Sequence, residues 1–340
     1  MAETTNIAWA HATWSPWRGC AKVSPGCDHC YAEAMSHRNP AVLGEWGTDG
    51  VRVVNKDWNK PLQWDRAAAK AGERRRVFPS LCDWLEDRPD LDKPLAQFLS
   101  LIDATPNLDW LLLTKRPELF RKRLRAAIDY MPKRGTVGPF TGPRWNTVDW
   151  LQGGEPSGRP YPPNVWHIAS VEDQARADER IGHLLAAPAA VRGLSVEPLL
   201  GPIDLTPWLA SPSEYNVLKA SRGEPAWDRR PRISWVIAGG ESGPNARPCD
   251  IAWIRSIVRQ CRESGVPVFV KQLGANVVAS NDAVADWFGS VGHLDMATTE
   301  RFQGATGRIR GLRHPKGGDP MEWPEDLRVQ EFPAVKGVVA

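Results

Sequence analysis

Trp110-Leu111-Leu112-Leu113-Thr114 is the clearest strand pattern in this chain of 340 residues. Similar short apolar runs occur on both sides of it, at 7–9, 77–80, 165–171, 191–196, 234–239 and 266–271. Amphipathic stretches such as 173–185 and 251–261 lie between the runs, with apolar residues at helical spacing. Strands that alternate with helices are typical of a parallel sheet covered by helices. We therefore predict an α/β fold, a parallel (β/α) partial or full TIM-like barrel.

Two stretches interrupt this alternation. Residues 130–164 are rich in Pro, Gly and Trp, and residues 208–232 are polar. Both are predicted to be insertions between barrel units, where substrate-specific loops usually occur, and Trp side chains there could form a lid. Residues 275–340 have weak periodicity and a basic stretch. We predict a barrel domain over 1–274 and an irregular C-terminal extension over 275–340 that packs on it.

Composition limits the possible partners and compartments. The 43 basic and 40 acidic residues leave a formal net charge of +3, so bulk charge does not require a polyanion. No segment approaches the roughly 18 apolar residues that span a bilayer, and residues 1–14 lack the features of a secretory signal. We predict a cytoplasmic protein with reduced cysteines and no membrane partner. Most of the 17 Trp are expected to pack in the core.

Three of the six cysteines lie close together near the start of the chain, at Cys20, Cys27 and Cys30. In a reducing compartment, such a cluster is more often a metal site than a set of disulfides. A closed structural zinc or iron–sulfur site uses four protein ligands, so three thiolates leave one coordination position free for another molecule. The spacing also permits a structural zinc site in which His29 or His37 is the fourth ligand.

Polar side chains follow six consecutive predicted strands. Because the carboxyl ends of parallel barrel strands share one edge, these side chains predict a functional crevice there. They are Ser80, Asp83, Thr114, Lys115, Arg116, Ser170, Glu172, Ser195, Glu197, Glu241, Ser242, Asn245, Arg247, Lys271 and Gln272. Taken singly, each has a simpler explanation; Glu197, for example, could cap a turn before Pro198. The glycines of 239–243 resemble a phosphate loop only loosely, but they would let the backbone approach a ligand closely.

The cysteine segment and the strand ends together resemble a radical S-adenosylmethionine (SAM) family whose members are common in bacteriophage and prophage genomes. The resemblance runs from about residue 7 to residue 274 and includes residues 13–33, with the spacing C-x6-C-x2-C. The later motifs are Leu113-Thr114-Lys115-Arg116-Pro117, Ser170-Val171-Glu172-Asp173-Gln174, Leu194-Ser195-Val196-Glu197-Pro198, Gly239-Gly240-Glu241-Ser242-Gly243, Ala246-Arg247-Pro248 and Val270-Lys271-Gln272-Leu273-Gly274. The commonest pattern of the superfamily is C-x3-C-x2-C, so the first gap is longer here.

This resemblance implies a [4Fe-4S] cluster on Cys20, Cys27 and Cys30, with SAM bound to the iron that lacks a cysteine. One-electron reduction would cleave SAM to methionine and a 5′-deoxyadenosyl radical, which abstracts a hydrogen atom from the substrate. Two pairs of residues would bind SAM: Ser80 and Asp83 at the methionine amino group, Ser170 and Glu172 at the ribose hydroxyls. The candidate catalytic residues, which would face the substrate, are Lys115, Glu197, Glu241, Arg247 and Lys271.

The resemblance also suggests a substrate and partners. Some related phage enzymes act in thymidine hypermodification, so the leading hypothesis is isomerisation of an N-linked (glycinyl) thymidine in DNA to its C-linked form. DNA would contact Arg74–Arg76, the Arg121–Arg125 run and the basic tail, and a flavodoxin- or ferredoxin-type protein would supply electrons. Two alternatives remain open. One is a radical SAM lyase, or a radical SAM enzyme that modifies RNA or another DNA base. The other is a non-enzymatic zinc-binding phage protein.

Overall fold

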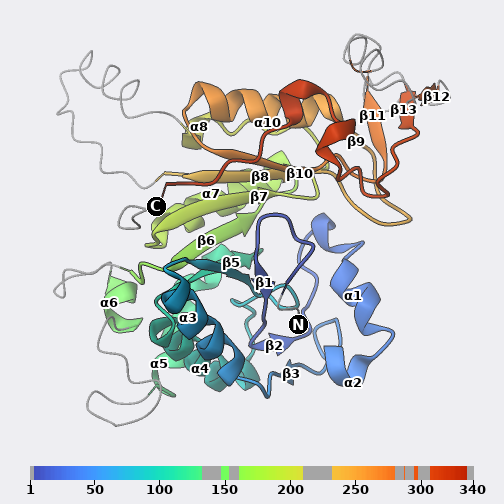
Figure 1. The fold of residues 1–340 in the computed structure, drawn as a ribbon. Helices are drawn as coiled ribbons and strands as arrows, with labels where there is room; N and C mark the ends of the chain where they lie inside the picture. The colour runs from blue at the N-terminus through green and yellow to red at the C-terminus, as the bar shows by residue number, and fades with distance from the viewer. Residues whose placement is uncertain are drawn as a thin grey trace, which may run out of the picture. The chain divides into compact units, whose positions relative to one another are not determined.

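The structure is a computed structural model, and it describes residues 4–131, 147–152, 161–209, 232–279, 287, 295–297 and 307–334. The chain divides into two compact units. The first unit comprises residues 1–169 and 182–192, and the second comprises residues 170–181 and 193–340. Figure 1 labels the helices and strands of both units and colours them from blue at the N-terminus to red at the C-terminus.

The main sheet is parallel in its described pairings, and its strand order is β1-β4-β5-β6-β7-β8-β10. The strands are β1 Ala12–Thr13, β4 Arg75–Phe78, β5 Leu108–Thr114, β6 Val165–Ser170, β7 Val191–Val196, β8 Trp235–Gly239 and β10 Val268–Gln272. Helices connect successive strands. A closed TIM barrel has eight strands in a ring, whereas this order runs from one edge strand to another. The predicted α/β fold is therefore confirmed as a partial (β/α) barrel.

The first strand lies later in the chain than predicted. Residues 7–10 form a turn in which the Ala10 N–H donates to the Ile7 carbonyl at 3.0 Å, and the strand is β1 instead. The Trp9 side chain packs on Phe78, with ring centroids 4.6 Å apart. An apolar run of three residues is too short for its period to distinguish a strand from a buried turn.

In the first unit, helices α3 Asn59–Ala71, α4 Asp92–Ala104 and α5 Phe120–Ile128 cover the sheet (Figure 1). Helix α3 contacts β4 and β5, and α4 contacts both α3 and α5. The short helices α1 Tyr31–Ser36 and α2 Pro40–Leu43 contact each other, and α6 Thr147–Gln152 packs on α5. Strands β2 Trp17–Arg18 and β3 Val53–Val54 form a separate antiparallel pair.

Tryptophan rings fill the core of the first unit. Trp14 meets Trp110 edge-on at 5.8 Å between ring centroids, and Trp84 stacks on Trp150 at 6.2 Å. All four of these side chains are buried. Trp150 lies within the predicted insertion 130–164, so this tryptophan belongs to the core and does not form a lid. The rest of both predicted insertions lies mostly outside the described residues, at 132–146, 153–160 and 210–231.

In the second unit, helix α10 Ile251–Glu263 packs on β8 and β10. Helices α7 Gln174–Ala186 and α8 Thr206–Leu209 precede it in the chain. A second sheet has the order β12-β13-β11-β9, with strands β9 Cys249–Asp250, β11 Val277–Ala279, β12 Asp295–Ala297 and β13 Gly307–Arg310.

The C-terminal extension is less irregular than predicted. It contributes β11, β12 and β13 to the second sheet, and Gln330 forms an antiparallel bridge with Phe269 of β10. Strands of three or four residues are too short to show alternation in sequence, which explains why the periodicity is weak. No helix in the described part of the chain is both long enough and apolar enough to cross a membrane.

Candidate functional site

The three clustered cysteines lie in one loop of the first unit. Cys20 follows strand β2, Cys27 ends a short 3-10 helix, and Cys30 directly precedes helix α1. All three are free thiols and half-buried. The loop is attached at both ends: the Gly47 N–H donates to the Cys20 carbonyl at 3.0 Å, and the Tyr31 hydroxyl donates to the Ser80 carbonyl at 2.9 Å. Cys20 is therefore fixed to the segment around residue 47, and the start of α1 is fixed to the loop after β4.

A buried ion pair holds the segment behind Cys20. Arg52, whose side chain is 1% exposed, contacts both carboxylate oxygens of Glu86 at 2.9 and 2.5 Å and donates to three backbone carbonyls within residues 45–50. Gly19 packs against this arrangement with φ +107°, and an added Cβ would lie 2.7 Å from a backbone oxygen of the same segment. Only glycine fits there, because both the backbone conformation and the space exclude a side chain.

We expect Arg52→Met to lower the free energy of unfolding by about 3–5 kcal/mol, because it leaves the Glu86 carboxylate buried and unpaired. Chemical denaturation followed by tryptophan fluorescence measures this change. The control is Lys122→Met, since Lys122 pairs with Asp87 at a surface where the two side chains are 63% and 39% exposed. A surface pair contributes at most about 1 kcal/mol. Equal losses in the two variants would contradict the assignment of Arg52 as a buried clamp.

The environment of the cysteines opposes bare thiolates. Burial, and next the charge of Asp83, raise the pKa of Cys20 to about 12, while Arg116 acts in the opposite direction. Burial also raises the pKa of Cys30, and hydrogen bonds from the backbone of Glu33 and Ala32 partly offset it. A thiolate at either position therefore needs a positive partner, and a metal centre is such a partner.

Arg116 lies directly against the cysteine loop. Its Nη1 donates to the Cys20 sulfur at 3.7 Å and to Asp83 Oδ2 at 2.8 Å, and its Nη2 donates to the Ala21 carbonyl at 2.6 Å. The Arg116 and Asp83 side chains are each 7% exposed. Strands β4 and β5 are paired in parallel, so the residues that follow them meet at the same edge of the sheet. At this edge the structure brings together two of the predicted polar residues, Asp83 and Arg116, as an ion pair, and Arg116 also contacts Cys20.

Both oxygens of Asp83 are occupied. Oδ1 accepts hydrogen bonds from the Thr114 hydroxyl at 2.6 Å and from the Leu85 N–H at 3.1 Å, and Oδ2 accepts from the Lys115 N–H at 2.9 Å and from Arg116. A carboxylate has about four acceptor sites. In this geometry Asp83 has none left for the methionine amino group, the role that sequence predicted for it.

Ser80 and Lys115 lie with Asp83 in the first unit, where the Ser80 carbonyl accepts from Tyr31 and the Lys115 N–H donates to Asp83. The predicted site residues Ser170, Glu172, Glu197, Glu241, Arg247 and Lys271 belong to the second unit, where the charged ones are paired. Glu172 is fully buried and pairs with Arg180 at 3.0 Å, and the Ser170 hydroxyl donates to the Glu197 carbonyl at 3.3 Å. The remaining four form two ion pairs, each with a shortest contact of 2.5 Å: Lys271 with Glu197, and Arg247 with Glu241. A substrate or cofactor that binds the carboxylate of Glu172, Glu197 or Glu241 would therefore share it with the basic side chain that already pairs with it.

The paired glycines after β8 have a structural role. A Cβ on Gly240 would lie 2.2 Å from the Leu273 carbonyl oxygen, so glycine is required where the ends of β8 and β10 approach each other. The close approach predicted for a ligand is thus made by the chain's own backbone. The helix beyond, α10, is capped by Asp250, whose side chain accepts a hydrogen bond from the Ala252 N–H.

The donor set fits an iron–sulfur cluster. The thiols in residues 20–30 are free, and the Arg116 guanidinium and backbone N–H groups stabilise negative charge at Cys20 and Cys30. No group of three or more His, Cys, Asp or Glu side chains in the described residues surrounds a single metal ion. In a [4Fe-4S] cluster each thiolate binds a different iron atom, so its ligands stand further apart than those of one ion. His29 and His37, the residues considered for a zinc site, are exposed.

The basic residues considered for DNA are largely engaged within the protein. Arg74 pairs with Asp109 at 2.7 Å, Arg75 lies over the Trp64 ring, and Arg76 donates to the Trp9 carbonyl. These arginines lie at or before the start of β4, at the opposite end of that strand from Ser80 and Asp83. In the run 121–125, Arg123 is buried against Asp92, at 2.6 Å. Part of the basic tail, including Arg301, lies outside the described residues.

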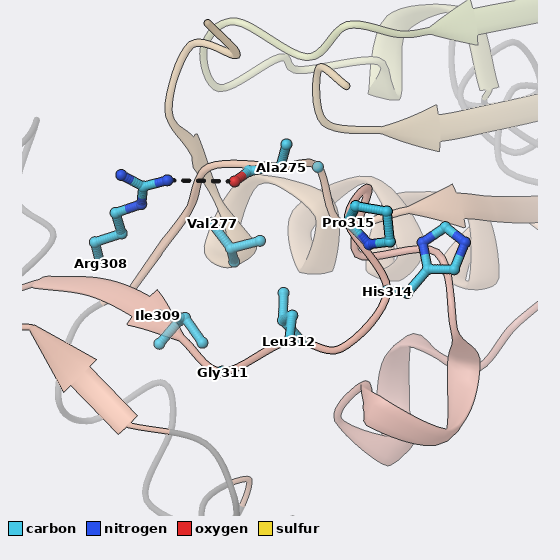
Figure 2. Close-up of a pocket in the computed structure, with 9 residues that line it drawn as sticks. Ala275, Val277, Arg308, Ile309, Gly311, Leu312, His314 and Pro315 are labelled. Carbon is cyan, nitrogen blue, oxygen red and sulfur yellow. Dashed lines mark hydrogen bonds between the residues drawn. The ribbon is translucent and has the colours of Figure 1, made fainter. Parts of the chain in front are cut away.

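A pocket of about 340 Å³ lies in the second unit. None of the residues predicted for catalysis, SAM or the cluster lines it, but Arg308 and His314 of the basic tail do. Figure 2 shows Val277, Ile309 and Leu312 around its interior and Arg308 at one side, where the guanidinium donates to the Ala275 carbonyl at 3.5 Å. His314 and Pro315 bound it on the other side (Figure 2).

Three features near the site are absent from the sequence-based prediction. Arg116 was predicted at a strand end but not as a partner of Cys20, and the Arg52–Glu86 pair has no signal because its members are 34 residues apart. The third is His167 in β6, which is fully buried and has no hydrogen-bond partner among the described residues. A histidine inside an apolar strand run is the one sequence signal that predicts its burial.

The fold and site define a class: a partial (β/α) barrel protein with an N-terminal loop of three free cysteines. The chain belongs to the family DUF5131, described as "Protein of unknown function", whose model matches residues 4–310. A comparison with curated proteins finds no match. Among solved structures, spore photoproduct lyase complexed with dinucleoside spore photoproduct is similar at 11% identity and a TM-score of 0.37, over 89% of this chain and 68% of that one. So low a TM-score supports no inference about what this chain binds.

Proposed function

We propose that this chain is a radical SAM enzyme that holds a [4Fe-4S] cluster on Cys20, Cys27 and Cys30. One observation carries the proposal beyond the sequence resemblance. Three free thiols lie in one loop, and that loop is joined to the carboxyl end of β4, where the Gly19 N–H donates to the Leu81 carbonyl at 3.1 Å. In (β/α) barrels this end of the strands is where active sites lie.

The cluster and SAM, when bound, would supply a 5′-deoxyadenosyl radical for hydrogen abstraction. The protein's part is to hold the cluster through three thiolates, to position SAM and to exclude water. Ser80, Ser170 and Glu172 are proposed to bind SAM. The proposed substrate-facing residues are Lys115, Glu197, Glu241, Arg247 and Lys271, of which the cations suit carboxylate or phosphate groups.

For the substrate, we propose a modified nucleobase in DNA, in the cytoplasm of the cell. The specific candidate is a thymidine that carries an N-linked glycinyl group and is isomerised to the C-linked form. An enzyme reaches such a base by flipping it out of the duplex. A flavodoxin- or ferredoxin-type protein would donate the electron. The resemblance to phage radical SAM proteins supports this candidate; a lyase or an RNA-modifying enzyme is the alternative within the same class.

Anaerobic reconstitution with iron and sulfide tests the class. We expect a brown protein with visible absorption from the cluster that forms 5′-deoxyadenosine from SAM when dithionite is added. A colourless protein that instead binds one equivalent of zinc would show that the cysteines form a structural site. Mass spectrometry of nucleosides from phage DNA, made with and without the gene, tests the substrate. A modified thymidine whose mass is unchanged but whose linkage changes would support isomerisation.

A further inference from the structure

Arg116 is built into the protein as a charged donor to one cysteine. Its guanidinium is buried, and its three contacts are the Cys20 sulfur at 3.7 Å, the Asp83 carboxylate at 2.8 Å and the Ala21 carbonyl at 2.6 Å. Two of these contacts are to the cysteine loop itself, and the third fixes the guanidinium from the side of β4. A buried arginine whose planar group is held on three sides has little freedom to turn away from the sulfur.

Asp83 holds that arginine in place. Its other three hydrogen bonds come from Thr114, Lys115 and Leu85, so the carboxylate is fixed by β5 and by its own loop before it meets Arg116. The pair places a positive charge next to Cys20 and a negative charge behind it. The two side chains therefore act on Cys20 with opposite signs.

Hydrogen bonds and charges at the thiolates set the reduction potential of an iron–sulfur cluster. We propose that Arg116 raises the reduction potential of the cluster held by Cys20, and that Asp83 is the positioning residue that orients Arg116 and moderates its effect. The inference rests on the proposed function. Reduction adds one electron, taken from a flavodoxin- or ferredoxin-type donor, and lowers the net charge of the cluster by one. No bond to Arg116 forms or breaks.

The test is the midpoint potential of the reconstituted cluster, measured by anaerobic redox titration with EPR detection of the reduced state. We expect Arg116→Gln to reduce the ratio of reduced to oxidised cluster at a fixed potential at least tenfold, equal to a shift of about 59 mV to more negative values. Asp83→Asn removes the opposing negative charge and leaves Arg116, so we expect a shift in the opposite direction. Arg116→Lys retains the charge and is expected to lie between Arg116→Gln and the unaltered protein.

The matched controls are Arg123→Gln and Asp92→Asn. Arg123 and Asp92 form another Arg–Asp pair of the first unit at 2.6 Å, with Arg123 buried. Neither change is expected to move the potential, although either can lower stability. If Arg116 has a purely structural role, Arg116→Gln and Asp83→Asn will shift the potential equally and in the same direction, or will not shift it. Either result, in protein with a normal iron content, would overturn the inference. Protein that takes up no iron at all would instead overturn the proposed function, and this inference with it.

Discussion

Alanine in place of Cys20, Cys27 or Cys30 is expected to slow the formation of 5′-deoxyadenosine from SAM by at least about a thousandfold, because ligands that act as one unit do not replace one another. Each substitution leaves two thiolates in a loop whose backbone contacts are otherwise unchanged. We also expect the iron retained after desalting to fall sharply. Iron content and 5′-deoxyadenosine, both measured after identical anaerobic reconstitution, check this result.

The single cysteines outside the cluster supply the controls. Cys261 is fully buried in α10 of the second unit, and Cys261→Ala should keep iron and activity while losing about 1 kcal/mol of stability from the lost packing. Cys82 is a stricter control, because it lies close enough to Cys20 for the two to interact. Burial, and next the charge of a Cys20 thiolate, raise the pKa of Cys82. If Cys82→Ala loses iron as completely as Cys20→Ala, the assignment of the three ligands is wrong.

The position of Asp83 and Arg116 could be predicted from sequence, but their contacts could not. Asp83 and Arg116 follow consecutive parallel strands, and the shared edge of such strands predicts that they lie near each other. Their pairing and their contact with Cys20 depend on side-chain rotamers and on the path of the cysteine loop, and no sequence pattern encodes either. Strand β7, in contrast, could be predicted from sequence. Its bounds match the predicted strand because buried parallel strands give continuous apolar runs.

The Arg52–Glu86 pair marks a different limit. Arg52 lies beside β3, a strand of two residues, and Glu86 lies in the loop after β4. In sequence both look like ordinary surface charges, since charged residues are rarely buried. Their burial follows from the way the segment 45–52 folds against Cys20, and only the tertiary structure shows it. The cysteines themselves were predictable, because their spacing is local and their chemistry is restrictive.

His167 gives the second large expected effect, a loss of stability in acid. It lies in β6 with the rings of Trp84 and Phe120 at 5.4 and 5.6 Å between centroids, and its side chain is fully buried. Burial, and next the charge of Arg192, lower its pKa to about 3. The folded protein therefore keeps this imidazole neutral at pH values where the unfolded chain, with a histidine pKa of about 6.5, binds a proton.

The sign follows from this difference in proton binding. Between about pH 6.5 and pH 3 the unfolded state binds more protons than the folded state. The contribution of neutral His167 to the free energy of unfolding is therefore fully present above this window and is lost as the pH decreases through it. The slope is at most about 1.4 kcal/mol per pH unit for one group. We expect the free energy of unfolding to fall by about 2–3 kcal/mol more in the unaltered protein than in His167→Leu between pH 7.5 and pH 4.5.

Urea denaturation at a series of pH values measures this difference, and the leucine variant is the reference because it has a similar volume and no titrating group. His183→Gln is the matched control: His183 is an exposed histidine of α7, and its loss should leave the pH dependence of the unaltered protein in place. Parallel curves for the unaltered protein and His167→Leu would mean that His167 binds protons equally in the folded and unfolded states, and would contradict the lowered pKa. A loss in acid that disappears in His167→Leu and persists in His183→Gln would assign that loss to His167.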